Sequence, residues 1–152
     1  MISKNELVFL SCLRNSSREK LTTISKEIGI PVSTLFEKLK KLEKSTITRH
    51  TVLLDFDKLG YSTRAKILLK VGKKDKENIR GYLSRSESVN SVFKITNGYD
   101  YLIETVFQNF NGLETFMEIL EEKFTITKKE IFYIIDDVGR ENFLSKTNLV
   151  KI

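Results

Sequence analysis

The spacing of hydrophobic residues changes near residue 50, and this change constrains the fold more than any other feature of the chain. Before it, apolar side chains recur at the spacing of amphipathic helices. From residue 64 onward, segments with an apolar residue at every second position alternate with helical segments. A chain of 152 residues has room for two small units. We therefore expect a helical unit followed by a mixed α+β unit.

Composition adds two expectations about partners. Hydrophobic residues make up 40% of the chain and charged residues 30%, which is typical of globular proteins. Two units of this size each bury a lower fraction of their surface than a larger domain does, so association between chains is expected. The net charge is +6 and the pI about 9.3, which fits a polyanionic partner. The basic excess is concentrated in residues 1–60, which carry 11 Lys/Arg and 7 Asp/Glu.

Several function classes are disfavoured by what the sequence lacks. Cys12 is the only cysteine and His50 the only histidine, so neither a disulfide nor a histidine-rich metal site can form within one chain. No apolar run approaches the length of a membrane span. Residues 1–6 do not have the layout of a signal peptide. We expect a prokaryotic cytoplasmic protein that is not an enzyme, does not contact the membrane and needs no cofactor or metal.

The first 50 residues have the layout of a helix-turn-helix. A short apolar helix around residues 7–13 is followed by a second helix ending at Ile28, with Thr22 as its expected N-cap. Gly29 stands where a C-cap glycine belongs, and Pro31 stands where a new helix begins. The third helix is expected over residues 32–44, with an apolar stripe that includes Leu35 and Leu42.

The face of the third helix opposite its leucines suits a DNA groove. Short hydroxyl side chains can reach base edges, whereas lysines can neutralise phosphates. The candidate contacts to base edges are Ser33, Thr34, Glu37 and Lys38, and the other candidate DNA-binding residues are Thr22, Thr23, Val32, Lys40, Lys41, Arg49 and His50. The alternative is that these side chains form an ordinary solvated surface. Phe36 is expected to make a packing contact, and Cys12 to be a core residue.

The rest of the chain predicts a β-α-β-β-α-β unit, the ferredoxin-like arrangement. A strand over residues 47–54 and a hinge over 55–61 lead into it. The expected strands are 64–71, 89–96, 101–107 and 130–135; the expected helices are 76–85 and a second one capped by Asn111. We divide the chain into residues 1–50, a linker over 51–63, and residues 64–152. Residues 137–152 are expected to be a loop, a tail or an exchanged edge strand. A second copy of the sheet is the most economical cover for the face without helices.

Two runs of sequence resemble the leucine-responsive regulatory protein (Lrp)/AsnC family. They are residues 21–35, continued by Leu39-Lys40-Lys41-Leu42-Glu43, and the turn Thr96-Asn97-Gly98-Tyr99-Asp100-Tyr101-Leu102. Asp55 to Tyr61 resembles the linker of that family. The chain departs from the family in having Pro31 at a usual serine and no glycine in Lys44-Ser45-Thr46-Ile47.

This resemblance implies an α+β protein with an N-terminal winged helix-turn-helix and a C-terminal ferredoxin-like domain. It implies a transcriptional regulator that binds semi-palindromic operators in double-stranded DNA as a homodimer or a larger oligomer, such as a tetramer or octamer. It also implies an amino-acid effector near the glycine turn. The candidate effector-binding residues are Asn97, Gly98, Tyr99, Asp100 and Asp136.

Other interpretations remain open from the sequence. Gly98 is also explained as a turn residue, Asp100 as a hairpin cap and Asp136 as part of a solvated turn. The architecture resembles that of tetrapyrrole (sirohaem-type) decarboxylases, although residues 61–152 contain no histidine. A third reading is an architectural protein that binds DNA with little sequence preference. The two hypotheses differ in the ratio of affinity for a preferred site to affinity for random DNA, which is high for a regulator and low for an architectural protein.

Overall fold

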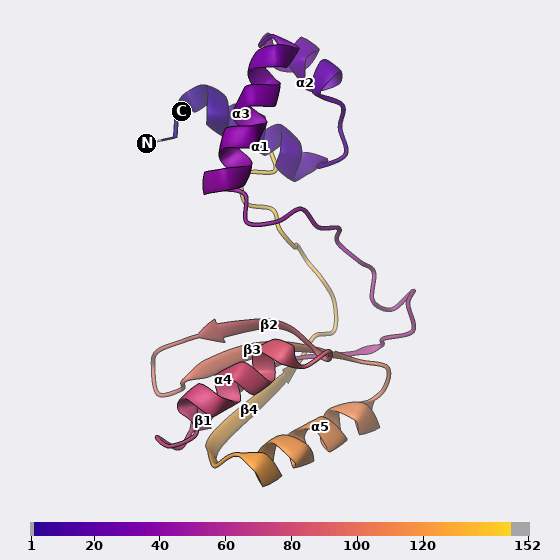
Figure 1. Ribbon diagram of the computed structural model, residues 1–152. Helices are drawn as coiled ribbons and strands as arrows, with labels where there is room; N and C mark the ends of the chain where they lie inside the picture. The colour runs from indigo at the N-terminus through magenta and orange to yellow at the C-terminus, as the bar shows by residue number, and fades with distance from the viewer. Residues whose placement is uncertain (1, 147–152) are drawn as a thin grey trace. The chain divides into compact units, whose positions relative to one another are not determined.

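The computed structural model describes residues 2–146, and the chain forms two compact units (Figure 1). Among the described residues, one unit contains residues 2–53 together with residues 138–146, and the other contains Leu54–Asp137. The first unit is helical and the second contains a sheet with two helices, so the expected α+β class is confirmed. The chain therefore leaves the helical unit and later returns to it.

Three helices form the first unit: α1 (Lys4–Asn15), α2 (Leu21–Ile28) and α3 (Val32–Ser45). Gly29 ends α2 with φ +71°, as expected, and Pro31 is the N-cap of α3. The prediction of Thr22 as N-cap was wrong: the N-cap is Lys20, two residues earlier, and α2 begins at Leu21. The reason is that Leu21 packs against the core and is already helical. The core of this unit contains Phe9, Leu10, Cys12, Ile24, Leu35 and Leu42, all buried.

Residues 47–54 form no strand, which corrects the sequence prediction and leaves the described helical unit without a wing. The segment is rich in β-branched and apolar residues, but within residues 2–146 no other strand pairs with it. A strand needs a neighbour to satisfy its backbone groups, so propensity alone does not form one. Val52, Leu53 and Leu54 are consequently exposed.

The described end of the chain packs against α1. Arg14, in the last turn of α1, donates from Nε to the Phe143 carbonyl at 3.0 Å and from Nη2 to the Glu141 carbonyl at 2.8 Å. Its Nη1 forms an ion pair with the Glu141 carboxylate at 3.0 Å. Up to Lys146 the segment has no strand, and the remaining residues of the predicted tail, 147–152, lie outside the described part of the chain.

The second unit has the predicted β-α-β-β-α-β order. Its elements are β1 (Thr63–Val71), α4 (Lys76–Arg85), β2 (Val89–Lys94), β3 (Tyr101–Phe107), α5 (Phe110–Lys123) and β4 (Ile126–Tyr133). The strands are antiparallel in the order β2-β3-β1-β4, and both helices cover the same face (Figure 1). The buried core between the helices and the sheet includes Ile67, Leu69 and Ile103 from the strands and Leu83 and Leu120 from the helices.

Two element starts differ from the prediction by more than one residue. Asn109, rather than Asn111, caps α5, because the Asn109 side chain accepts a hydrogen bond from Gly112 N–H at 3.1 Å. Strand β4 begins at Ile126, four residues before the predicted start. The early part of β4 is polar because it is an edge strand, hydrogen-bonded only to β1 on one side, so its sequence lacks the usual alternation.

The sheet face without helices is a mixture of apolar and charged side chains. Phe93, Leu102 and Leu68 are cross-strand neighbours on β2, β3 and β1. Lys66 and Glu104 are neighbours in the adjacent row, beside Phe132 on β4. Phe93 is 52% exposed and Phe132 54% exposed. Within the sheet unit, residues 54–137, no helix or strand covers this face.

Candidate nucleic-acid interface

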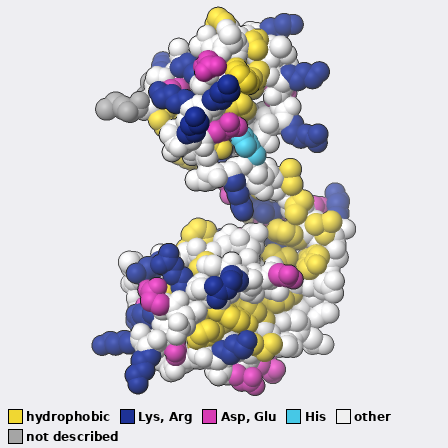
Figure 2. All heavy atoms as spheres, in the orientation of Figure 1, with side chains coloured by type: hydrophobic (Ala, Val, Ile, Leu, Met, Phe, Trp, Pro, Cys, Tyr) yellow, Lys and Arg dark blue, Asp and Glu magenta, His cyan; other side chains and the backbone are white. Residues whose placement is uncertain are grey.

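One face of helix α3 packs in the core of the helical unit, and the opposite face is exposed to solvent. Leu35 and Leu42 are buried in the core of the helical unit, with 0% and 2% exposure. The exposed residues of α3 include most of the predicted DNA contacts, namely Val32, Ser33, Thr34, Glu37, Lys40 and Lys41. Figure 2 shows basic side chains, mixed with a few acidic ones, on the face of this unit turned toward the viewer. The helix can therefore present hydroxyl groups at its start and ammonium groups farther along.

Lys38 and Lys41 differ from the other lysines of α3 because both lie near a carboxylate. The Glu6 Oε1 atom is 4.0 Å from Lys38 Nζ and 3.7 Å from Lys41 Nζ. The Lys38 side chain is 25% exposed and that of Lys41 is 76% exposed. Lys38 is thus partly withdrawn from the surface on which the sequence analysis placed it.

Glu6 was not among the predicted site residues. Ser3 donates its N–H at 2.8 Å and its hydroxyl at 2.9 Å to Glu6 Oε2, which completes a capping box at the start of α1. These two bonds are the main cause of a Glu6 pKa lowered to about 2, and Lys41 and Lys38 lower it further. The Ser-x-x-Glu spacing of residues 3–6 is a sequence signal for this cap, but it does not identify the contact with α3.

Phe36 and Lys40 form a second exposed feature of α3. The Lys40 ammonium lies 4.4 Å from the centre of the Phe36 ring, which is a cation–π distance. Phe36 is 47% exposed, so within the described chain it packs mainly beneath Lys40 and not in the core.

The predicted contacts outside α3 occupy two places. Thr22 and Thr23 are exposed in the first turn of α2, and the Thr23 N–H already donates to the Lys20 carbonyl at 2.9 Å. Arg49 and His50 are exposed in the segment after α3. His50 Nε2 lies 3.0 Å from Glu43 Oε1, so the imidazole bonds to the last part of α3.

Most of the candidate effector residues lie at the turn between β2 and β3. Asn97 and Gly98 have φ +64° and +90°, as a tight hairpin turn requires. Asp100 accepts a hydrogen bond from Val71 N–H at 2.9 Å and an ion-paired one from Lys76 Nζ at 2.5 Å. Burial opposes ionisation of Asp100, but these bonds outweigh it and lower the Asp100 pKa. Asp100 therefore joins the turn to β1 and α4.

Tyr99 and Asp136 have different surroundings. The Tyr99 hydroxyl donates to the Glu130 carboxylate on β4, and the Lys128 ammonium lies 4.5 Å from the Tyr99 ring centre. Asp136 is exposed after β4, and the next residue, Asp137, forms an ion pair with Arg64 at 2.8 Å.

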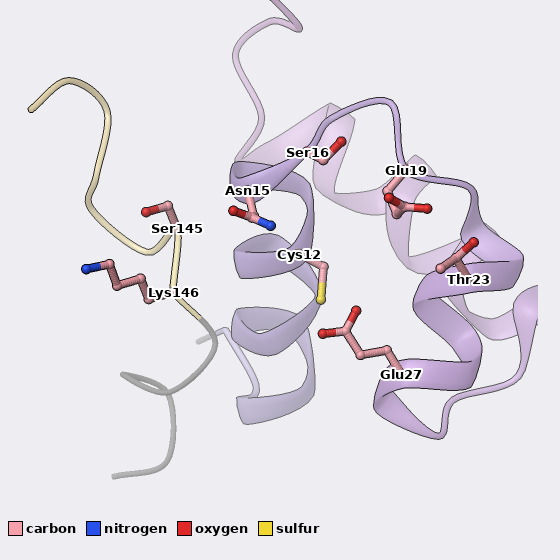
Figure 3. A pocket seen from close by; sticks show the side chains of 8 residues that line it. All are labelled: Cys12, Asn15, Ser16, Glu19, Thr23, Glu27, Ser145 and Lys146. Carbon is pink, nitrogen blue, oxygen red and sulfur yellow. The ribbon is translucent and has the colours of Figure 1, made fainter.

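A cavity of about 340 Å³ lies in the helical unit, and none of its lining residues belongs to α3 (Figure 3). Its lining residues are Cys12, Asn15, Ser16, Glu19, Thr23, Glu27, Ser145 and Lys146. Cys12 is a core residue, as expected, and burial raises the pKa of its thiol. Only Thr23 belongs to the predicted site.

Neither a metal centre nor a membrane span is found in the described residues. No group of three or more His, Cys, Asp or Glu side chains within residues 2–146 is arranged to hold a metal ion. None of the helices in that range combines the length and the hydrophobicity needed to cross a bilayer.

Comparison with known proteins gives relatives over most of the chain. No protein-family model matches it. It is 30% identical to the HTH-type transcriptional regulator FL11 of Pyrococcus horikoshii over 112 residues, which are 73% of this chain and 74% of the relative. It is 31% identical to the uncharacterized HTH-type transcriptional regulator PF1734 of Pyrococcus furiosus over 110 residues, 72% of this chain and 74% of the relative.

Solved structures share the fold at low sequence identity. Bacillus subtilis LrpC has a TM-score of 0.82 at 16% identity, over 91% of this chain and 98% of its own. Escherichia coli AsnC has a TM-score of 0.80 at 17% identity, over 92% and 96%. The regulator NMB0573 of Neisseria meningitidis, solved in complex with L-Met, has a TM-score of 0.84 at 19% identity, over 92% and 94%.

Proposed function

This chain belongs to the Lrp/AsnC family of HTH-type transcriptional regulators, and from that membership we propose that it binds semi-palindromic operators as a homodimer. Its relatives are transcriptional regulators, and it is a DNA-binding regulator. We further propose which surface of α3 enters the DNA groove, how two chains associate and where an effector binds.

The single observation that carries the proposed interface is the two-sided character of α3. Two leucines fix the helix in the core, and the opposite face carries hydroxyl and basic side chains in solvent. In this proposal Ser33 and Thr34 reach base edges at the N-terminal end of the helix, as in other helix-turn-helix proteins. Lys40, Lys41 and Arg49 contact phosphates, which fixes the position of the helix without reading sequence.

The uncovered sheet face supports a two-fold dimer. Its apolar row of Phe93, Leu102 and Leu68 lies beside the oppositely charged neighbours Lys66 and Glu104. A surface with apolar residues and both signs of charge can match a copy of itself about a two-fold axis. Two α3 helices related in this way would enter successive major grooves, about 34 Å apart.

An amino-acid effector is proposed at the turn between β2 and β3. The L-Met complex of NMB0573 supports an amino acid as the chemical class. Because Asp100 already holds Val71 and Lys76, the backbone around Gly98 is the more available part of the turn. A double-stranded DNA target and prokaryotic relatives also support a cytoplasmic location.

Selection of bound sequences from a random DNA pool, with and without an amino-acid mixture, tests this function. We expect enrichment of a motif whose two halves are related by symmetry and lie about one helical turn apart. We expect the amino-acid mixture to change the enrichment. Recovery of a pool with no shared motif would contradict the operator proposal and favour an architectural role.

A further inference from the structure

Glu6 is the only carboxylate found within 4.0 Å of two lysines of α3 among the described residues. It is on α1, whereas both lysines are on the helix that the proposed function places in the DNA groove. Glu6 is 7% exposed, so its charge lies behind the surface and not on it. The contact therefore joins the interior of the helical unit to its candidate DNA-binding face.

The Glu6 carboxylate is held in place more firmly than the lysines. Oε2 accepts the N–H and the hydroxyl of Ser3, and the neighbouring core residues Phe9 and Leu10 anchor α1. The distances of 3.7 and 4.0 Å to the lysines are long for ion pairs, and the Lys41 side chain is 76% exposed. Lys41 can therefore turn toward a phosphate while the carboxylate stays where it is.

We propose that Glu6 is a positioning residue of the DNA-binding surface: it orients Lys38 and Lys41 and offsets part of their charge, which weakens binding to DNA of any sequence. The inference rests on the proposed function of α3. A phosphate approaching either lysine also approaches Glu6, well within the screening distance of about 8 Å at physiological salt. Every DNA sequence has the same phosphates, so the effect is equal for cognate and random DNA. Glu6 thereby reduces the electrostatic part of binding relative to base recognition.

The test replaces Glu6 by glutamine, which keeps the capping box. Glutamine at this position can still accept the Ser3 bonds, because Ser-x-x-Gln caps helices as Ser-x-x-Glu does. Only the charge is then lost. The control is Glu27→Gln, which changes the net charge of the same unit equally but lies beside Cys12 in the cavity (Figure 3). Glu6→Asp retains a charge and is the rescue variant.

The full-length protein is titrated with a random 30-base-pair duplex at salt concentrations from 50 to 200 mM. If the lysine charge that Glu6 no longer offsets neutralises one more phosphate per protomer, the slope of log affinity against log salt concentration steepens by about 0.9 per protomer. Between 50 and 200 mM salt, the affinity of Glu6→Gln then falls by roughly 3- to 4-fold more per protomer than the affinity of the wild-type protein. At 100 mM salt, Glu6→Gln binds DNA up to roughly 8-fold more tightly per protomer than the wild-type protein does. Glu27→Gln and Glu6→Asp should have wild-type slopes.

Two further measurements separate the possible outcomes. Ser3→Ala weakens the cap but leaves the carboxylate, so it should lower the melting temperature without steepening the salt dependence. Elution from immobilised heparin tests the same charge without any operator, and Glu6→Gln should elute at higher salt than Glu27→Gln. Equal slopes and equal elution for these two variants would overturn the proposal for Glu6. Failure of the wild-type protein to select any sequence would overturn only the proposed function.

Discussion

Leu35→Ala should unfold the helical unit selectively. Leu35 is fully buried among Phe9, Ile24 and Leu42, and a buried Leu→Ala change costs roughly 3–5 kcal/mol through lost transfer energy and the cavity left behind. A unit of about 60 residues has a stability of only roughly 3–9 kcal/mol. The substitution therefore removes much or all of it, and with ~4–8 °C per kcal/mol the melting temperature falls by at least about 12 °C.

Calorimetry of the full chain measures this effect, because the sheet unit is a separate compact unit with its own core. We expect a lower or absent helical transition, a nearly unchanged transition for the sheet unit, and loss of DNA binding. Leu53→Ala is the matched control: it makes the same chemical change in the helical unit at a side chain that is 56% exposed, and should cost less than about 1 kcal/mol. A Leu35→Ala effect below 1 kcal/mol, or an equal shift of both transitions, would refute the reasoning.

Four other substitutions or conditions have expected outcomes. The Glu6 pKa is lowered to about 2, so the stability that the ionised carboxylate contributes is present above its ordinary pKa of 4.5 and is lost as the pH falls from about 4.5 to 2. When acid unfolding is followed by circular dichroism, the stability of Glu6→Gln should depend less on pH in that range than the stability of the wild-type protein. An equal pH dependence for the two proteins would contradict the assignment. Asp100→Asn should destabilise the sheet unit by roughly 1–3 kcal/mol in urea unfolding at pH 7, because the charged bond to Lys76 is lost; a neutral effect would show that this pair adds little. Gly98→Ala should cost about 1 kcal/mol, since φ +90° strains a side-chain-bearing residue while space is open around it. Arg14→Ala should speed proteolysis within residues 138–146, because three bonds to that segment are removed; cleavage at the wild-type rate would mean that other contacts hold it.

The elements were largely predictable because most of them have a one-sided apolar pattern. Strand β1 alternates from Ala65 to Val71, and Gly29 with Pro31 marks the turn between α2 and α3. The predictions were wrong where contacts between distant parts of the chain determine whether a strand forms. Residues 47–54 have strand propensity but no strand beside them, and the polar start of β4 is paired through its backbone to β1.

The candidate site was predictable in its position on α3 but not in its electrostatics. The leucine stripe determines which residues of α3 face solvent, so Ser33, Thr34 and Lys41 could be placed from periodicity. The proximity of Glu6 to Lys38 depends on how α1 packs against α3, and residues 32 positions apart in sequence carry no local signal for it. The same holds for Asp100 and Lys76, which meet only in the folded sheet unit.

Cleavage of DNA from a reagent attached to α3 is the most direct test of the central claim that this helix enters the major groove. Cys12 is buried, so Ser33→Cys supplies a single accessible thiol for an iron chelate that cuts nearby DNA. The account predicts cleavage at two clusters about one helical turn apart on a selected operator, and little cleavage when the chelate is at Thr127→Cys on β4. Stronger cleavage from β4 than from α3, or none from α3 on bound DNA, would contradict it.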